Sequence, residues 1–250
     1  MPDPMTVYVC CAWLNILFGS IALFQKKIAG AMVIWTLLGL FWAVQMASFF
    51  MAAEITSLSG VAPTFGIASL VICLWQGRTL KQDYKSVLIR PHFNSFFLTL
   101  LACGSLVIED SPHDSFMMGY IFAKLFFLSR PLSLGLTLFA LGGAATSIFL
   151  KMDENADGMI LAQSKNAAFL AAIIFLGGEI CGCYWGFMGW GTTWRWSGNF
   201  YFSAMLFVLF MVSLHVPRSL FPSVKAWNLG FSIPLAVIAL AMTLSKVMNS

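Results

Sequence analysis

Three tryptophans and an arginine lie close together in the stretch GWGTTWRWSGNFYF, residues 189–202. Trp190, Trp194 and Trp196 offer rigid apolar faces, and Arg195 adds a positive charge and hydrogen-bond donors. Glycines and small hydroxyl residues separate the indoles and favour a tight, non-helical backbone. Such a set suits a planar macrocycle with carboxylate substituents. The alternative is an aromatic belt, in which indoles lie at the headgroup level of a membrane.

Histidine, the usual imidazole ligand of metals, occurs at three positions. His92 is predicted to be a solvated residue at a membrane interface. His113 lies in the acidic stretch SPHDS, where the neighbouring Asp110 and Asp114 favour the protonated form that cannot ligate. His215 ends an apolar run, as a helix-end residue or as a ligand.

Glu179 is the one carboxylate inside an apolar run, in the stretch LGGEICG. Charge is costly in a membrane and is usually paired or functional. Two interpretations remain open. Glu179 forms a structural ion pair with Arg130 or Arg195, or it contacts a bound ligand. The flanking glycines permit close approach of a neighbouring helix.

The elements that carry these residues follow from composition. Of the 250 residues, 60% are hydrophobic and only 10% are charged, too few to cover a soluble domain. Apolar runs near the ~20-residue length of a membrane span recur throughout. We therefore predict an all-α protein, a polytopic transmembrane bundle forming one domain over residues 1–250. The predicted spans are 5–24, 28–53, 58–76, 92–108, 131–150, 167–188, 199–216 and 227–246.

The distribution of basic residues predicts an orientation with the N-terminus outside, because cytoplasmic loops hold an excess of Lys and Arg. Arg195 and Lys246 then lie outside. The inner connections carry Lys26, Lys27, Arg78, Lys81, Lys85, Arg90, Lys151, Lys165, Arg218 and Lys225. For residues 115–130 we predict a short helix along the outer interface, with a break at Pro131 before the fifth span. If residues 115–130 crossed the membrane separately, the orientation of everything downstream would be inverted.

Other classes of function find no support in the sequence. No hydrolytic triad, phosphate loop or nucleotide fingerprint occurs, and a net charge of +4 does not indicate a nucleic-acid partner. All six cysteines lie in apolar runs and are predicted to pack between helices. No Lys or Arg precedes the first apolar run, so that helix is predicted to be retained. A solute transporter ranks last, because no inverted repeat is visible.

The stretch GWGTTWRWSGNF resembles the tryptophan-rich signature W-G-x-x-W-x-W-D of the cytochrome c assembly family. These are haem-handling membrane proteins of the CcsA/ResC and CcmC type. The resemblance is densest over residues 167–218, where the signature lies between the predicted sixth and seventh spans.

This resemblance implies a protein that holds non-covalent, b-type haem at an outer tryptophan platform for delivery to apocytochrome c. It implies a second assembly subunit as partner, a bacterial inner-membrane location and no catalysis by this chain alone. Residues Trp190, Trp194 and Trp196 match the platform, and His215 matches a histidine associated with an inner haem position. Arg195 or Arg130 would approach the propionates, and haem iron is the only metal implied.

The sequence also departs from the family pattern. Ser197 replaces the closing acidic residue of the signature, and Ser129 and Arg130 lie where an outer histidine is expected. The second outer histidine is also missing near the end of the last span. His113 or a partner would then supply the iron ligand. The alternative is a structural membrane subunit of a cytochrome-containing complex that does not handle haem.

Overall fold

A computed structural model describes residues 4–24, 28–52, 58, 60–79, 90–107, 120–149, 154–193 and 198–248. These residues form α-helices and one short 3-10 turn, and no strand occurs among them. The elements are α1 (Pro4–Phe24), α2 (Ile28–Ala52), α3 (Val61–Thr79), α4 (Arg90–Val107), α5 (Ile121–Phe149), α6 (Glu154–Trp190), α7 (Gly198–His215), η3 (Arg218–Leu220) and α8 (Val224–Met248).

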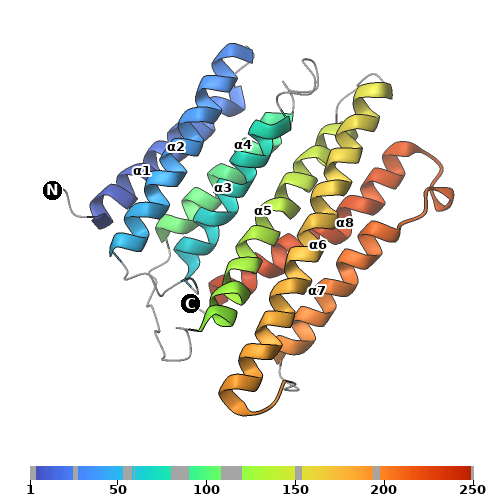
Figure 1. Cartoon of the computed structure of the whole chain (residues 1–250). Helices are drawn as coiled ribbons and strands as arrows, with labels where there is room; N and C mark the ends of the chain where they lie inside the picture. The colour runs from blue at the N-terminus through green and yellow to red at the C-terminus, as the bar shows by residue number, and fades with distance from the viewer. Residues whose placement is uncertain are drawn as a thin grey trace.

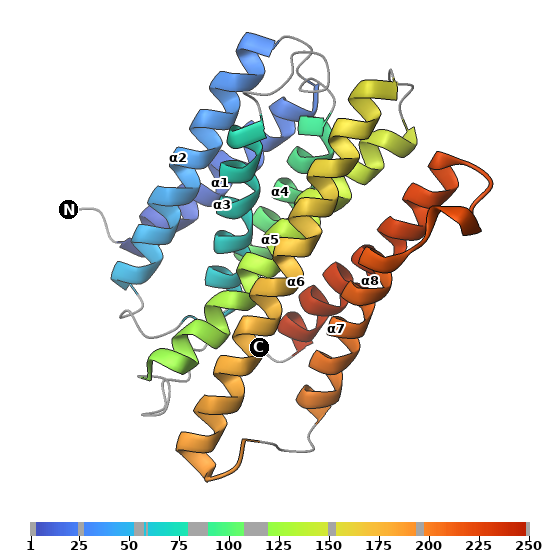
Figure 2. The ribbon, with the colours of Figure 1, turned by 45° about the vertical axis from the view of Figure 1, so that its right-hand side comes forward.

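Successive helices run antiparallel, as the ribbon shows from two directions (Figures 1 and 2). The end where α6 finishes and α5 and α7 begin is called here the α6–α7 end. The opposite end, where α7 is followed by η3 and α8, is called the α7–α8 end.

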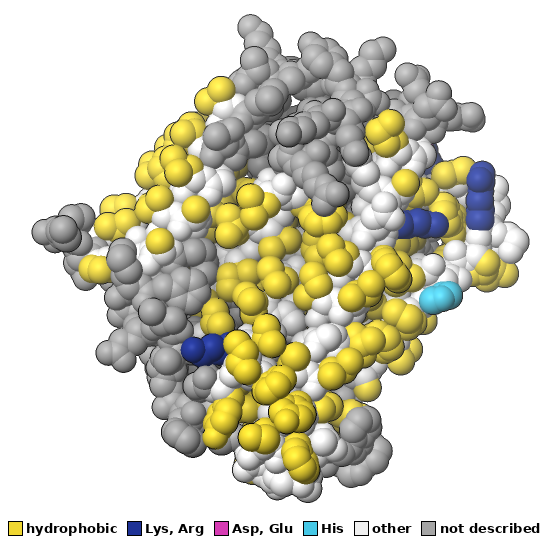
Figure 3. All heavy atoms as spheres, viewed as in Figure 1, with side chains coloured by type: hydrophobic (Ala, Val, Ile, Leu, Met, Phe, Trp, Pro, Cys, Tyr) yellow, Lys and Arg dark blue, Asp and Glu magenta, His cyan; other side chains and the backbone are white. Residues whose placement is uncertain are grey.

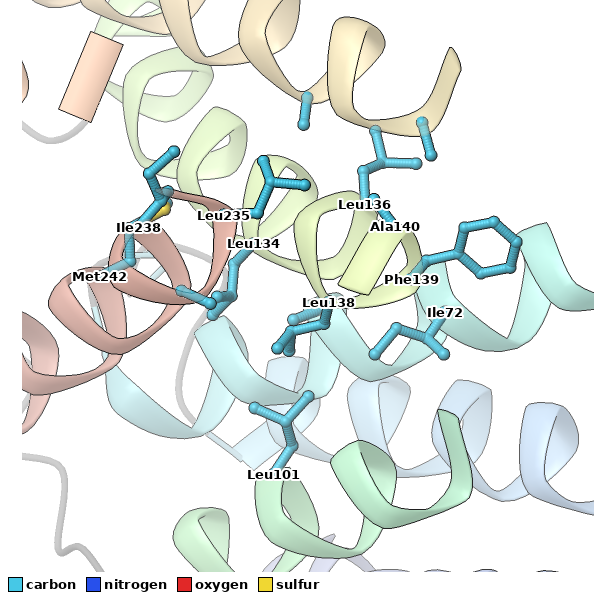
Figure 4. Packing of buried hydrophobic residues seen from close by; sticks show 14 of the residues in the cluster. Ile72, Leu101, Leu134, Leu136, Leu138, Phe139, Ala140, Leu235, Ile238 and Met242 are labelled. Atoms are coloured by element: carbon cyan, nitrogen blue, oxygen red, sulfur yellow. The ribbon is translucent and has the colours of Figure 1, made fainter. Parts of the chain in front are cut away.

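Helix α5 lies at the centre of the bundle and contacts α3, α4, α6 and α8. Leucines at 134, 136 and 138 point to different neighbours, and side chains from α3, α4 and α8 pack around them (Figure 4). Small residues allow this crowding. A Cβ on Gly135 would lie 2.5 Å from the Ala68 carbonyl oxygen of α3, so only glycine permits this approach.

The predicted break at Pro131 is wrong. Helix α5 runs without interruption from Ile121 to Phe149, with Pro131 inside it and buried. Proline removes one helical hydrogen bond and normally bends or ends a helix, but neighbouring helices offset this in a packed bundle. The predicted interfacial helix is therefore absent over 121–130, and residues 115–119 lie outside the described part of the chain.

Helix α6 also differs from its predicted span of 167–188, because it extends from Glu154 to Trp190. Its first turns are polar but contain no helix-breaking proline, so the helix begins well before the apolar run. Hydropathy predicts which part of a helix can lie in lipid, but it does not predict where the helix begins or ends.

Apolar side chains both fill the core and cover the outside of the bundle, and several polar side chains are buried between the helices. Many large apolar side chains are exposed, and they are spread over the described part of the face shown in Figure 3. Buried polar side chains join the helices in pairs instead: Asn15 with Gln45, Asn94 with Gln76, Asn228 with Ser147, Ser133 with the Ala171 carbonyl, and Ser213 with the Phe231 carbonyl. Polar contacts between helices and an apolar exterior are typical of membrane bundles.

Four described helices are long and apolar enough to cross a membrane: Ile121–Phe149, Asp157–Trp190, Gly198–His215 and Val224–Met248. Shorter apolar helical stretches cover Thr6–Ile21, Val61–Gln76 and Phe93–Leu106.

Candidate functional site at the α6–α7 end

Trp190 is the last residue of α6, and its side chain is 52% exposed. The helix stops here because Gly191 adopts a left-handed conformation (φ 73°) and donates its N–H to the Phe187 carbonyl at 2.9 Å. This is the usual glycine termination of a helix. Trp194, Arg195 and Trp196 lie outside the residues that the structure describes.

Trp190 belongs to a group of aromatic side chains from α5 and α6. The group is called here the aromatic cluster and consists of Phe122, Phe126, Phe127, Tyr184, Trp185 and Trp190. The rings of Trp185 and Trp190 meet edge to face, with centroids 5.6 Å apart. Trp185 continues the contact to Phe127 at 5.8 Å and Phe126 at 6.2 Å. Edge-to-face packing holds these rings in fixed orientations.

Sequence reasoning singled out Trp190 and missed the rest of the aromatic cluster. Two signals in the sequence could have indicated it. The stretch YWGFMGW brings Trp185 and Trp190 within about a turn and a half of α6, and IFAKLFF brings three phenylalanines to the start of α5. The pairing of these two stretches depends on how α5 and α6 pack.

Two glycines of α6 bring the helices together. A Cβ on Gly178 would overlap the Ser129 hydroxyl, and a Cβ on Gly182 would lie 2.6 Å from the Phe126 ring. The missing side chains therefore let α5 approach closely and place Phe126 against the backbone of α6. The predicted role of the glycines around Glu179 is confirmed for Gly178 and Gly182 and is wrong for Gly177, where a Cβ would meet nothing within 4 Å.

An ion pair lies between the two ends of the bundle. Arg130 of α5 donates from Nη2 to Oε1 of Glu179 in α6 at 2.8 Å, and also to the Ser203 hydroxyl of α7 at 3.0 Å. The Arg130 guanidinium carbon is 4.6 Å from the centre of the Phe126 ring. The Arg130 guanidinium thus joins α5, α6 and α7 and also contacts the aromatic cluster.

The ion pair is set well inside the helices. Glu179 precedes Trp190 by eleven residues, or ~16 Å at about 1.5 Å per residue. The side chains of Arg130 and Glu179 are 27% and 25% exposed, and Nε of Arg130 is buried without a partner. Because each charge compensates the other, their separation would leave a charge uncompensated among apolar groups. Of the two interpretations left open for Glu179, the structure contains the ion pair with Arg130.

His215 lies far from the aromatic cluster. It is the last residue of α7, and the seventeen residue steps from Gly198 correspond to ~26 Å of helix. Its ring is exposed, and Nδ1 donates to the Met211 carbonyl at 2.8 Å, which leaves Nε2 available as an acceptor or ligand. His113 lies outside the described residues, and the side chain of His92 does too.

A shallow apolar groove of about 270 Å³ runs along α5 and α6, lined by Leu125, Leu128, Ser129, Leu132, Ile174, Gly177, Gly178 and Cys181. It contains neither member of the ion pair. No group of three His, Cys, Asp or Glu side chains gathers as metal ligands within the described residues. The described side chains at the α6–α7 end thus form an aromatic cluster of tilted and edge-to-face rings.

The described chain is thus an all-helical protein with four helices able, by length and composition, to span a membrane. Comparison of the sequence with protein-family models and with curated proteins finds no match.

Proposed function

We propose that this chain is an eight-span membrane protein that binds b-type haem non-covalently at its α6–α7 end, for delivery to apocytochrome c. The proposal places the N-terminus and this end outside a bacterial inner membrane. The aromatic cluster carries it, because the fixed rings of Trp185 and Trp190 lead directly into the segment that contains Trp194 and Trp196. The likeness of this segment to the cytochrome c assembly signature also supports the proposal.

The antiparallel order of the helices supports the proposed orientation. Nine of the fourteen Lys and Arg residues lie in the connections at the α7–α8 end or in the helix ends next to them, whereas Arg195 and Lys246 belong to the α6–α7 end. An excess of Lys and Arg is typical of cytoplasmic loops. The α6–α7 end would then face outward, where c-type cytochromes receive haem.

The proposal gives the two arginines different roles. Arg130 is already neutralised by Glu179, and it joins α5, α6 and α7, so we assign it to positioning. Arg195 is then the residue that would pair with a haem propionate. Trp190, Trp194 and Trp196 would cover the porphyrin face and exclude water from it.

Iron ligation in this proposal falls to His113 or to a partner subunit. His215 lies at the opposite end of α7 and would serve only a haem near the inner face. Haem supplies the vinyl groups that react with apocytochrome thiols, and a second assembly subunit would position those thiols. The chain would therefore act as a binding and presenting subunit, with no catalytic residue of its own.

Haem content tests the proposal directly. The protein is extracted from haem-replete bacterial membranes in a mild detergent, and its Soret absorbance and pyridine haemochrome spectrum are recorded. Trp190→Ala combined with Trp194→Ala should reduce bound haem at least roughly fivefold, equivalent to the loss of about 1 kcal/mol of stacking energy. Trp13→Leu is the matched control, because Trp13 is an exposed tryptophan on α1. Wild-type protein without haem would contradict the proposal.

One observation favours a second candidate, a structural membrane subunit of a cytochrome-containing complex. No described imidazole lies at the α6–α7 end, although a haem site there would use one. Co-purification of a stoichiometric partner, together with the absence of haem from this chain, would select this candidate over haem delivery.

A further inference from the structure

We propose that the α7–α8 end binds the phosphate of an anionic phospholipid, through Lys165, Arg218 and Lys225. The inference rests on the membrane placement in the proposed function and is independent of haem. It concerns three cations from α6, η3 and α8 that no part of the haem proposal uses.

Trp227 of α8 is the centre of this site. The Lys165 ammonium of α6 lies 3.9 Å from the centre of the Trp227 ring, a cation–π contact. The indole N–H of Trp227 donates to the Val216 carbonyl at 2.9 Å, two residues before Arg218. One indole therefore fixes Lys165 of α6 beside the connection that carries Arg218.

The connection itself is well defined. Phe221 packs so closely on α8 that a Cβ on Gly230 would lie 2.5 Å from its ring. Ser223 begins α8 by accepting the Ala226 N–H on its hydroxyl at 3.1 Å. The backbone carrying Arg218 and Lys225 is thus held in place, which lowers the entropy lost when a ligand is bound.

The charge of this end favours an anion. Arg218 and Lys225 are both exposed, and neither has a carboxylate partner among the described residues. Figure 3 shows Lys and Arg side chains gathered at this end of the molecule, with the histidine nearby. The described carboxylate on this side is Asp157, two helical turns or ~12 Å from Lys165 along α6.

A lipid fits the site better than a soluble anion because apolar groups accompany the cations. Leu220, in the same 3-10 turn as Arg218, is 74% exposed. Leu229 and Ile233, further along α8, are also exposed apolar residues. A phospholipid would place its phosphate on the cations and its acyl chains along this apolar surface. Basic residues at the cytoplasmic face of a membrane attract anionic lipids in the same way.

Lipid retention tests the inference. The full-length protein is purified with an equimolar mixture of phosphatidylglycerol and phosphatidylcholine, and the bound lipids are measured by native mass spectrometry. Wild type should prefer phosphatidylglycerol, and Arg218→Gln with Lys225→Gln should lower that preference roughly 10- to 30-fold, from about 1 kcal/mol per basic residue. Lys246→Gln, a basic residue of the opposite end, is the matched control and should leave the preference unchanged.

Equal retention of the two lipids by wild type, or an equal loss in Lys246→Gln, would overturn the inference. Retention of the preference by the double variant would also overturn it. If the double variant does not fold, each single variant and a salt titration of wild type take its place, and a preference that persists at high salt contradicts the site. A preference abolished equally by millimolar inorganic phosphate would show that free phosphate is the ligand. Haem measured in the same samples separates a failure of this inference from a failure of the proposed function.

Discussion

A charged group inside an apolar helix is stable only when its partner is close. Arg130 and Glu179 meet at 2.8 Å, and the Ser203 hydroxyl accepts a further hydrogen bond from the same guanidinium nitrogen. The Phe126 ring adds a cation–π contact to this group. Each charge therefore has a partner of opposite sign within the bundle. This is why a polar group can join α5, α6 and α7 within an apolar region.

Replacing one partner tests the ion pair. Glu179→Leu leaves Arg130 uncompensated and should destabilise the protein by about 2 kcal/mol, below the ~3–5 kcal/mol of a fully buried pair because both side chains are a quarter exposed. Thermal unfolding in detergent measures the change. Arg130→Met combined with Glu179→Leu should recover most of the loss. A double variant as unstable as the sum of the single variants would show that the two charges do not interact.

A second residue-scale prediction concerns the amide pair of α1 and α2. Asn15 donates to Gln45 at 3.0 Å, and both side chains are fully buried. Gln45→Leu should cost roughly 1–3 kcal/mol, because the Asn15 amide then remains buried without its partner. Asn15→Leu with Gln45→Leu removes both polar groups and should cost less than Gln45→Leu alone. Chemical denaturation of the two variants gives the comparison, and the reverse order of stability would refute the interpretation.

At the scale of elements, the packing of α5 against α6 depends on which α6 glycine faces α5. Gly178 faces Ser129, whereas a Cβ on the adjacent Gly177 would meet nothing within 4 Å. Gly178→Ala should therefore destabilise the protein by about 1–3 kcal/mol through overpacking. Gly177→Ala should be neutral or stabilising by up to about 1 kcal/mol, because alanine favours the helix. Unfolding temperatures of these neighbouring variants provide the test. Equal effects of the two substitutions would mean that α6 is rotated about its axis relative to the orientation described here, so that Gly178 does not face α5.

Hydropathy predicted most of the elements from the sequence, and the errors have a common cause. Apolar runs predicted helices α1 to α4, α7 and α8 to within a few residues. The break at Pro131 was wrong, since burial of α5 against its neighbours outweighs the local preference of proline. The start of α6 was missed because its first turns are helical without being apolar. Hydropathy reports only which residues suit lipid. It therefore missed the effect of helix packing at Pro131 and the polar first turns of α6.

At the scale of the whole molecule, the proposed orientation makes a labelling prediction. Thr192 and Ser219 are exposed residues at the α6–α7 and α7–α8 ends. An impermeant maleimide should label Thr192→Cys in intact spheroplasts, and Ser219→Cys only after the membrane is opened. Wild type is the control, because its described native cysteines lie within helices. Labelling of Ser219→Cys alone in intact spheroplasts would show that the orientation is inverted.

The sequence by itself determined the class of structure, since an apolar helix is recognised from its own residues. It also determined which side chains could do chemistry: the tryptophans before α7, the arginine at 130 and the carboxylate at 179. Only the tertiary structure decided that Arg130 pairs with Glu179 and Ser203, and that Trp185 packs against Trp190. These outcomes depend on how helices rotate and approach one another. That arrangement is set by glycine contacts and buried polar pairs between segments far apart in the chain, which no local pattern records.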